Sequence, residues 1–169
     1  MLSGGLFVES ISAPAQNLKI GPAETYIPLF TIERNVNRNT VHYDAKLGRD
    51  GKLDPKQPVI VYWVMGAEDG RRKELNVVER LKAYGITTQV FGPDETYRVT
   101  LAAQKTREIF VTHRGDAVRA EMQIGGHTSY LRRIYVTIHK SLLVETPQYI
   151  EMYGVDKATG EERYEKLLP

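Results

Sequence analysis

The chain has 169 residues, 23 of them basic and 21 acidic, with no cysteine, so disulfides, thiolate catalysis and cysteine-ligated metals are excluded. Charges of both signs are interleaved along the chain, and with a formal net charge of +2 this is too balanced for the basic stripe that binds nucleic acid. The longest apolar run, residues 58–65, is far shorter than the ~20 residues of a membrane helix, which predicts a soluble domain without a membrane span.

Residues 1–26 are predicted to form an arm or loop, and residues 27–169 a single domain. Gly4, Gly5, Pro14, Gly21 and Pro22 interrupt the first segment, whose periodicity is weak. Its short apolar stretch is not preceded by Lys or Arg, so it lacks the pattern of an intact signal peptide. Residues 1–16 are either an addition to the native protein or the remainder after its processing.

The first ordered elements are predicted to be a hairpin and a buried strand. Residues 29–35 and 40–46 favour strands, and the asparagine-rich connection between them suits a turn because Asn tolerates positive φ. A polar loop over residues 48–57 follows. Residues 58–65 are apolar at every position, which predicts a strand covered on both faces.

One amphipathic helix is predicted over residues 69–84. Leu75, Val78 and Leu81 recur at helical spacing, Asp69 favours the start, and Gly85 is placed as a C-terminal cap.

Short strands and turns fill the rest of the chain, and their regular spacing favours a barrel or sandwich. Gly160 suits a left-handed turn position that closes the last hairpin. The fold class predicted is mainly β: an antiparallel β-barrel or strongly curved meander of roughly eight to ten strands, with one amphipathic helix between the third and fourth strands. The predicted strands after the helix are residues 86–91, 97–101, 108–113, 118–124, 130–139, 148–155 and 162–167.

Several stretches resemble a known bacterial family. They are LFTIERNVNRNTVHYD at residues 29–44, PVIVYW at 58–63, AYG at 83–85 and YIEMYGVDKATGE at 149–161. The pattern is similar to the domain-of-unknown-function family numbered four-eight-three-three, over roughly residues 28–165. The resemblance supports one continuous domain and implies no activity. It implies a periplasmic or exported location, whereas the sequence itself also fits a cytoplasmic one.

Arg34 is the first candidate binding residue. Strand alternation places it on one face with Phe30 and Ile32, and if Tyr43 of the partner strand shares that face, both polar groups point into the core. A buried guanidinium requires a partner. Either an internal acid such as Asp44 or Glu79 satisfies Arg34, or a bound anion does.

Arg133, His139 and Tyr62 complete the candidate set. Alternation along residues 130–140 puts Ile134, Val136 and Ile138 on one face, and Arg133 and His139 on the other. That polar face either meets solvent or walls a cavity for an anionic or polyhydroxyl ligand. Tyr62 and Trp63 must face opposite sides, so one of them packs beneath the helix and the other enters the barrel or its core.

No catalytic or metal motif is present in the sequence. The four histidines are scattered, no phosphate-binding loop precedes the helix, and no cofactor is indicated. The function predicted is a non-enzymatic β-barrel module that binds a polar or anionic small ligand through Arg34, Tyr43, Tyr62, Arg133 and His139. The alternatives are an envelope-associated structural or interaction domain, which docks a protein partner or a second copy through its N-terminal arm or an edge strand, and a hydrolase.

Overall fold

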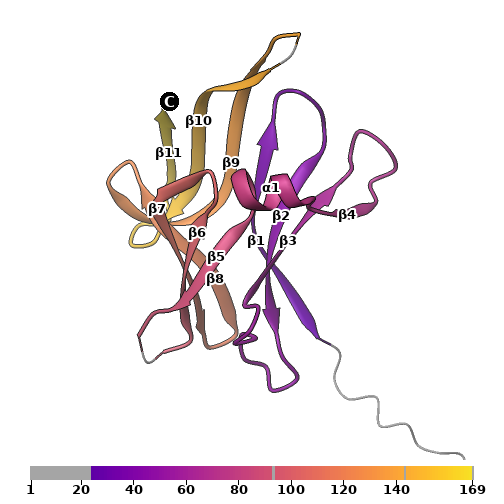
Figure 1. The fold of residues 1–169 in the computed structure, drawn as a ribbon. Helices are drawn as coiled ribbons and strands as arrows, with labels where there is room; N and C mark the ends of the chain where they lie inside the picture. Colours follow the sequence, from indigo (N-terminus) through magenta and orange to yellow (C-terminus); the bar gives the residue numbers. More distant parts are fainter. Residues whose placement is uncertain (1–23, 93, 143, 169) are drawn as a thin grey trace, which may run out of the picture.

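The computed structural model describes residues 24–92, 94–142 and 144–168, so the predicted arm lies almost entirely outside the described residues. Strands dominate, and one short helix interrupts them (Figure 1). In chain order the elements are β1 (Thr25–Arg34), β2 (Thr40–Leu47), β3 (Val59–Val64), β4 (Arg72–Glu74), α1 (Val77–Lys82), β5 (Ile86–Val90), β6 (Thr96–Leu101), β7 (Gln104–Arg114), β8 (Ala117–Ile124), β9 (His127–Lys140), β10 (Glu145–Asp156) and β11 (Glu162–Leu167).

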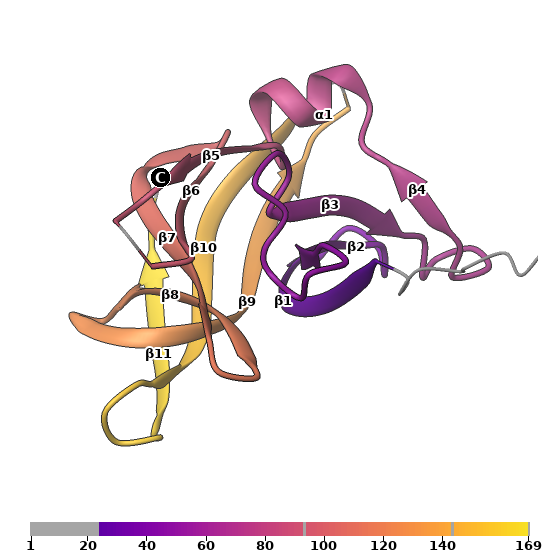
Figure 2. The same cartoon turned by 90° about the horizontal axis from the view of Figure 1, so that it is seen from below.

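The eleven strands of the described residues belong to one curled sheet, with the order β4-β3-β2-β1-β9-β8-β7-β6-β5 and with β10 and β11 branching from β9. The predicted fold class, a mainly antiparallel curved sheet with one helix, is confirmed. The curl produces a half-barrel: β1 to β4 form one wall, β5 to β8 form the other, and α1 connects the two (Figures 1 and 2).

The long strand β9 holds the two walls together. One edge of β9 pairs with β10 along residues 129–140. The other edge is shared, because residues 127–130 pair antiparallel with β8 and residues 133–136 pair parallel with β1. The parallel pairing of β1 with β9 is a feature that a simple meander lacks.

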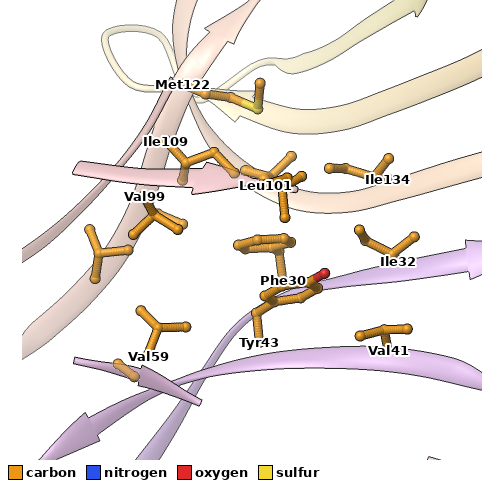
Figure 3. Packing of buried hydrophobic residues seen from close by; sticks show 14 of the residues in the cluster. Phe30, Ile32, Val41, Tyr43, Val59, Val99, Leu101, Ile109, Met122 and Ile134 are labelled. Carbon is orange, nitrogen blue, oxygen red and sulfur yellow. The ribbon is translucent and has the colours of Figure 1, made fainter. Parts of the chain in front are cut away.

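The core lies between the two walls. Phe30 and Tyr43 from one wall stack with their ring centroids 4.3 Å apart and face Leu101 and Ile109 from the other (Figure 3). These side chains are almost completely buried. Burial of apolar surface between the walls, at roughly 25 cal/mol per Å², is what keeps the half-barrel curled.

The predicted helix over residues 69–84 is too long. Only Val77–Lys82 is helical, and the preceding residues form the three-residue strand β4. Asn76 caps the helix, and its side chain and that of Glu79 form a capping box. Val78 and Leu81 are 65% and 68% exposed, so their helical spacing does not mark a face that packs on the core.

Gly85 ends the α1 segment for a steric reason. Its φ is not in the left-handed region, but a Cβ there would lie 1.8 Å from the carbonyl oxygen of Arg80. The turn that delivers the chain to β5 therefore requires a residue without a side chain.

Candidate functional site

A cavity of about 250 Å³ opens on the concave side of the half-barrel. Its walls are almost entirely apolar side chains, which come from β1, β6, β7, β8, β9 and β10 and from the segment after α1. The apolar lining residues are Ile32, Ala83, Tyr84, Leu101, Ala103, Ile109, Met122, Ile134, Val136, Ile138, Pro147, Ile150 and Met152.

Strand alternation explains why this cavity is apolar. Ile134, Val136 and Ile138 occupy alternate positions of β9 and turn the same way, into the cavity. Met152 lies opposite Ile134 on β10, and Ile32 lies opposite Ile134 on β1. Three adjacent strands therefore contribute one continuous apolar surface.

Arg34 lies on the same concave face as this surface. In the parallel pairing of β1 with β9, Ile32 is matched with Ile134 and Arg34 with Val136, so the Arg34 side chain leaves β1 on the same face as Val136, although Arg34 is not itself a lining residue of the cavity. Its side chain is only 15% exposed. The inward direction predicted by counting alternate positions agrees with this burial.

The guanidinium of Arg34 lies in an aromatic environment. Its Cζ is 4.9 Å from the ring centroid of Trp63 and 5.9 Å from that of Tyr84, within the range of cation–π attraction. The nearest carboxylate oxygen is Oε2 of Glu145, 3.9 Å from Nη1. The Nε atom is buried and has no hydrogen-bond partner within the described residues. Arg34 therefore retains donor capacity toward an anion.

The acids named as possible partners of Arg34 have other partners. Asp44 accepts a 2.6 Å hydrogen bond from the hydroxyl of Tyr62. Glu79 accepts hydrogen bonds from the indole N–H of Trp63, at 3.2 Å, and from the backbone of Asn76. The long contact with Glu145 is what the structure provides instead.

Tyr43 and Tyr62 have different surroundings. The buried Tyr43 donates a 2.7 Å hydrogen bond to the carbonyl oxygen of Tyr84, and burial raises its pKa well above the usual value. Tyr62 lies on the face of β3 opposite to that of Trp63, and the Cζ of Arg72 is 3.6 Å from the centroid of its ring. Partial burial and the hydrogen bond to Asp44 raise the pKa of Tyr62 to about 12. Neither hydroxyl lines the apolar cavity.

Arg133 and His139 lie outside the apolar cavity. Both occupy the face of β9 that alternates with its lining residues, and His139 is exposed. Arg133 is 42% exposed, lies over the ring of Tyr153 and contacts Glu33 at 3.5 Å. The five candidate residues are therefore not brought together: Arg34 and Tyr43 both contact Tyr84, whereas Tyr62, Arg133 and His139 are elsewhere.

The sequence reasoning did not identify Lys82, Gln104 and Arg107, which supply the polar lining of the cavity. Arg107 is held by a two-pronged ion pair with Glu165, whereas Lys82 makes no ion pair within the described residues. An alternating sequence pattern reveals an apolar face but does not reveal which polar residues meet at its rim, because those come from separate elements.

Histidine and carboxylate side chains in the described residues do not gather at the apolar cavity. No group of three or more His, Asp or Glu side chains in that part of the chain is arranged to hold a metal ion. His113 contacts Glu95 at 2.8 Å, and neither residue lines the apolar cavity. No helix in the described part of the chain has both the length and the apolar character that crossing a membrane requires.

Residues 30–166 match the family model described as Domain of unknown function (DUF4833). The chain belongs to this family. The match begins within β1 and ends within β11, so it covers nearly all of the curled sheet. The chain matched none of the curated proteins and none of the solved structures with which it was compared.

Proposed function

We propose that this DUF4833 domain binds a small amphipathic ligand, with an apolar body in the concave cavity and an anionic group directed toward Arg34. The anionic group was expected from the sequence, whereas the apolar body is proposed because the lining of the cavity is mostly apolar. The proposal rests on the apolar cavity of about 250 Å³. Its lining includes Ile134, which pairs with Ile32, and Val136, which pairs with Arg34.

The size and lining of the cavity support an apolar body. Engineered apolar cavities of roughly 150 Å³ take up benzene-sized molecules, and pockets for larger ligands begin at about 300 Å³. A volume of about 250 Å³ falls between these limits and suits a short acyl chain or a single substituted ring. Such a ligand restores the dispersion contacts that an open space withholds from its lining atoms.

The environment of Arg34 supports an anionic group. Its Nε atom has no partner within the described residues, and its contact with Glu145 is 3.9 Å, longer than a charge-assisted hydrogen bond. Lys82, at the rim of the cavity, adds a second cation.

Octanoate and its neutral analogue octanol are suitable probes of the proposal. Trp63 is the only tryptophan of the chain and lies against Arg34, so its fluorescence reports on this end of the cavity. Octanoate is expected to change the emission of Trp63 and to bind about tenfold more tightly than octanol, because a charged hydrogen bond contributes ~1.5–3 kcal/mol. Calorimetry gives the two affinities.

Two pairs of variants locate the site. Val136→Phe fills the cavity and is expected to abolish binding of both probes, whereas Thr137→Phe adds the same ring on the other face of β9 and should leave binding intact. Arg34→Met is expected to remove the preference for octanoate over octanol, and Arg133→Met is its control. Thermal melting of each variant establishes that it folds. Unchanged octanoate affinity in a folded Val136→Phe protein contradicts the proposal.

A further inference from the structure

A second cavity, of about 450 Å³, lies where the sheet fails to close into a full barrel. Its lining includes Val59 and Val61 of β3 on one side, and Ile86 and Thr88 of β5 on the other. The two strands belong to opposite walls of the half-barrel, and α1 lies between them along the chain (Figure 2). We name this opening the seam.

In β5, alternate residues direct their backbone N–H and C=O groups into the seam instead of toward β6. The N–H of Ala102 donates to the carbonyl of Gly85, and the N–H of Phe91 donates to the carbonyl of Thr96. The register between β5 and β6 is unbroken, so odd-numbered residues of β5 bond to β6. The N–H and C=O groups of Ile86 and Thr88 therefore point away from β6, toward the seam.

On the opposite side of the seam, alternate residues of β3 also direct their backbone N–H and C=O groups away from their paired strand, β2. The N–H of Lys46 donates to the carbonyl of Pro58, so the even-numbered residues of β3 bond to β2. The backbone groups of Val59 and Val61 point the other way. Pairing with β4 involves only residues 62–64 of β3, so these groups have no strand partner in the part of the chain that the structure describes.

The edge of β5 lacks the features that usually prevent strand addition. Its sequence, ITTQV, contains no charge and no proline, and β5 is an end of the sheet. Natural edge strands are commonly protected by lysine, proline or shortness. At the other end of the sheet, β4 is only three residues long and all three are charged.

The lining of the seam contains more basic than acidic side chains. Its lining contains Lys46, Lys56, Arg72 and Arg80, against the single carboxylate of Glu74. Lys56 and Arg72 make no ion pair within the described residues, whereas Lys46 contacts Glu24 and Asp54, and Arg80 contacts Glu74 at 3.7 Å. The side chains around the unpaired strand edges therefore favour a negatively charged occupant.

We propose that the seam accepts an extended acidic segment of a partner protein, which adds a strand to β5 and completes the barrel toward β3. Backbone hydrogen bonds to Ile86 and Thr88 supply the affinity, as in other cases of strand addition. The basic lining supplies the preference for glutamate and aspartate side chains. This inference does not depend on the ligand of the apolar cavity, because the seam is a separate opening.

A fluorescein-labelled peptide of alternating glutamate and valine, about seven residues long to span a strand, is the probe. Fluorescence anisotropy with the full chain is expected to show saturable, salt-sensitive binding, and a peptide with lysine in place of glutamate should bind at least ~10-fold more weakly. Equal binding of the two peptides, or binding of neither, overturns the proposal.

Variants of the strand edge and of the charges separate strand addition from charge attraction. Thr88→Pro removes a backbone N–H that does not bond to β6, and it is expected to weaken binding of the acidic peptide by ~10-fold. Thr88→Val keeps this N–H and is expected to bind the peptide with unchanged affinity. The double variant Lys56→Glu with Arg72→Glu should prefer the lysine peptide, a gain that misfolding cannot produce. The proposal is overturned if Thr88→Pro leaves the affinity for the acidic peptide unchanged, or if the double variant still prefers the acidic peptide to the lysine peptide.

Hydrogen exchange followed by NMR identifies the occupant. In the peptide-free monomer the amides of Ile86 and Thr88 are expected to exchange quickly and those of Thr87 and Gln89 slowly, and the acidic peptide should slow the first pair. Slow exchange of Ile86 and Thr88 in the peptide-free monomer means that the chain's own residues fill the seam. Light scattering that shows a dimer, lost in Thr88→Pro, assigns the seam to a second copy. Either outcome overturns the proposal.

Discussion

Asp156 holds the turn between β10 and β11 with both of its carboxylate oxygens. Oδ1 accepts hydrogen bonds from the backbone N–H groups of Ala158 and Thr159, and Oδ2 accepts one from Nε of Arg163 at 2.9 Å. Hydrogen bonding to Arg163, followed by the two backbone donors, lowers the pKa of Asp156 to about 2. The folded protein therefore favours the ionised form of this carboxyl.

Asp156→Asn is expected to lower the free energy of unfolding at pH 7, because the amide cannot replace a carboxylate opposite Arg163. The stabilisation by the wild-type carboxylate is present above its unfolded pKa of about 3.9 and is lost as the pH falls through about 2. The difference between variant and wild type should therefore shrink between these values. Urea denaturation at pH 7 and at lower pH measures it.

The control for this prediction is Glu161→Gln. Glu161 also contacts Arg163, at 3.2 Å, but it is 67% exposed. An exposed ion pair contributes little, so this variant should change stability by less than ~1 kcal/mol at either pH. A pH-independent loss in Asp156→Asn would show that the side chain acts through shape rather than charge.

At the residue scale, the turn position predicted for Gly160 is confirmed, whereas the positive φ expected for asparagine in the first turn is wrong, because no described residue other than glycine has a positive φ. Gly160 has a φ of 76°, as its predicted place in a hairpin turn requires. The inward direction of Arg34 follows from alternation and agrees with its burial. Its nearest carboxylate, Glu145, was not foreseen, because the two meet only through the pairing of β10 with β9 and of β9 with β1.

At the scale of elements, α1 is stabilised by the cap at its N-terminus and by a side-chain hydrogen bond to Trp63 of β3, and none of its residues is buried. Glu79 makes both connections: Oε2 accepts from the backbone N–H of Asn76 at 2.9 Å and from the indole N–H of Trp63 at 3.2 Å. The helix is thereby fixed over the strand that carries Trp63.

Glu79→Ala is expected to reduce the free energy of unfolding by about 1–2 kcal/mol, through loss of the capping box and of the hydrogen bond to Trp63. The emission of Trp63 should shift at the same time, since its N–H loses a charged partner. Chemical denaturation followed by fluorescence measures both effects. Glu74→Ala removes an exposed carboxylate just before the helix and should change neither property beyond ~0.5 kcal/mol.

The helix also shows why sequence periodicity gave too long an element. Leu75 is buried and Val78 and Leu81 follow at helical spacing, but Leu75 precedes the cap at Asn76 and packs with the sheet. The spacing therefore combined a core residue outside the helix with exposed residues inside it. Strands such as β6 and β8 were predicted more accurately, because their residues alternate against the core, whereas the fully exposed β4 was not predicted.

At the scale of the whole molecule, the parallel pairing of β1 with β9 determines how the two walls meet. This pairing joins residues about a hundred positions apart, and local patterns contain no information on such partners. The concave cavity depends on it, because Ile32 and Ile134 become neighbours only there. This is why the sequence predicted a curved sheet but not the apolar cavity.

Asn35 closes this junction just beyond the end of β1. Its side-chain N–H donates to the carbonyl of Ile138 at 3.0 Å, and its side-chain oxygen accepts from the N–H of Ile138 at 2.8 Å. The amide thus takes the place that the next residue of a longer parallel ladder would occupy. Asn35→Ala is expected to cost about 1–2 kcal/mol of unfolding free energy by chemical denaturation, and Asn37→Ala, in the exposed turn, about 0.5 kcal/mol or less.

Asn35→Asp tests whether the donated hydrogen bond matters as much as the accepted one. An ionised carboxylate can still accept from the N–H of Ile138, but it faces the carbonyl oxygen with no proton to donate. Protonation restores the donor, so the pKa of the introduced carboxyl should rise above about 3.9 in the folded state. Relative to wild type, the variant should then be destabilised at pH 7 and recover as the pH falls through that raised pKa, which denaturation across the pH range would measure. A constant difference at all pH values would mean that the junction depends on the accepted bond alone, and that the walls of the half-barrel are joined chiefly by the pairing of β1 with β9.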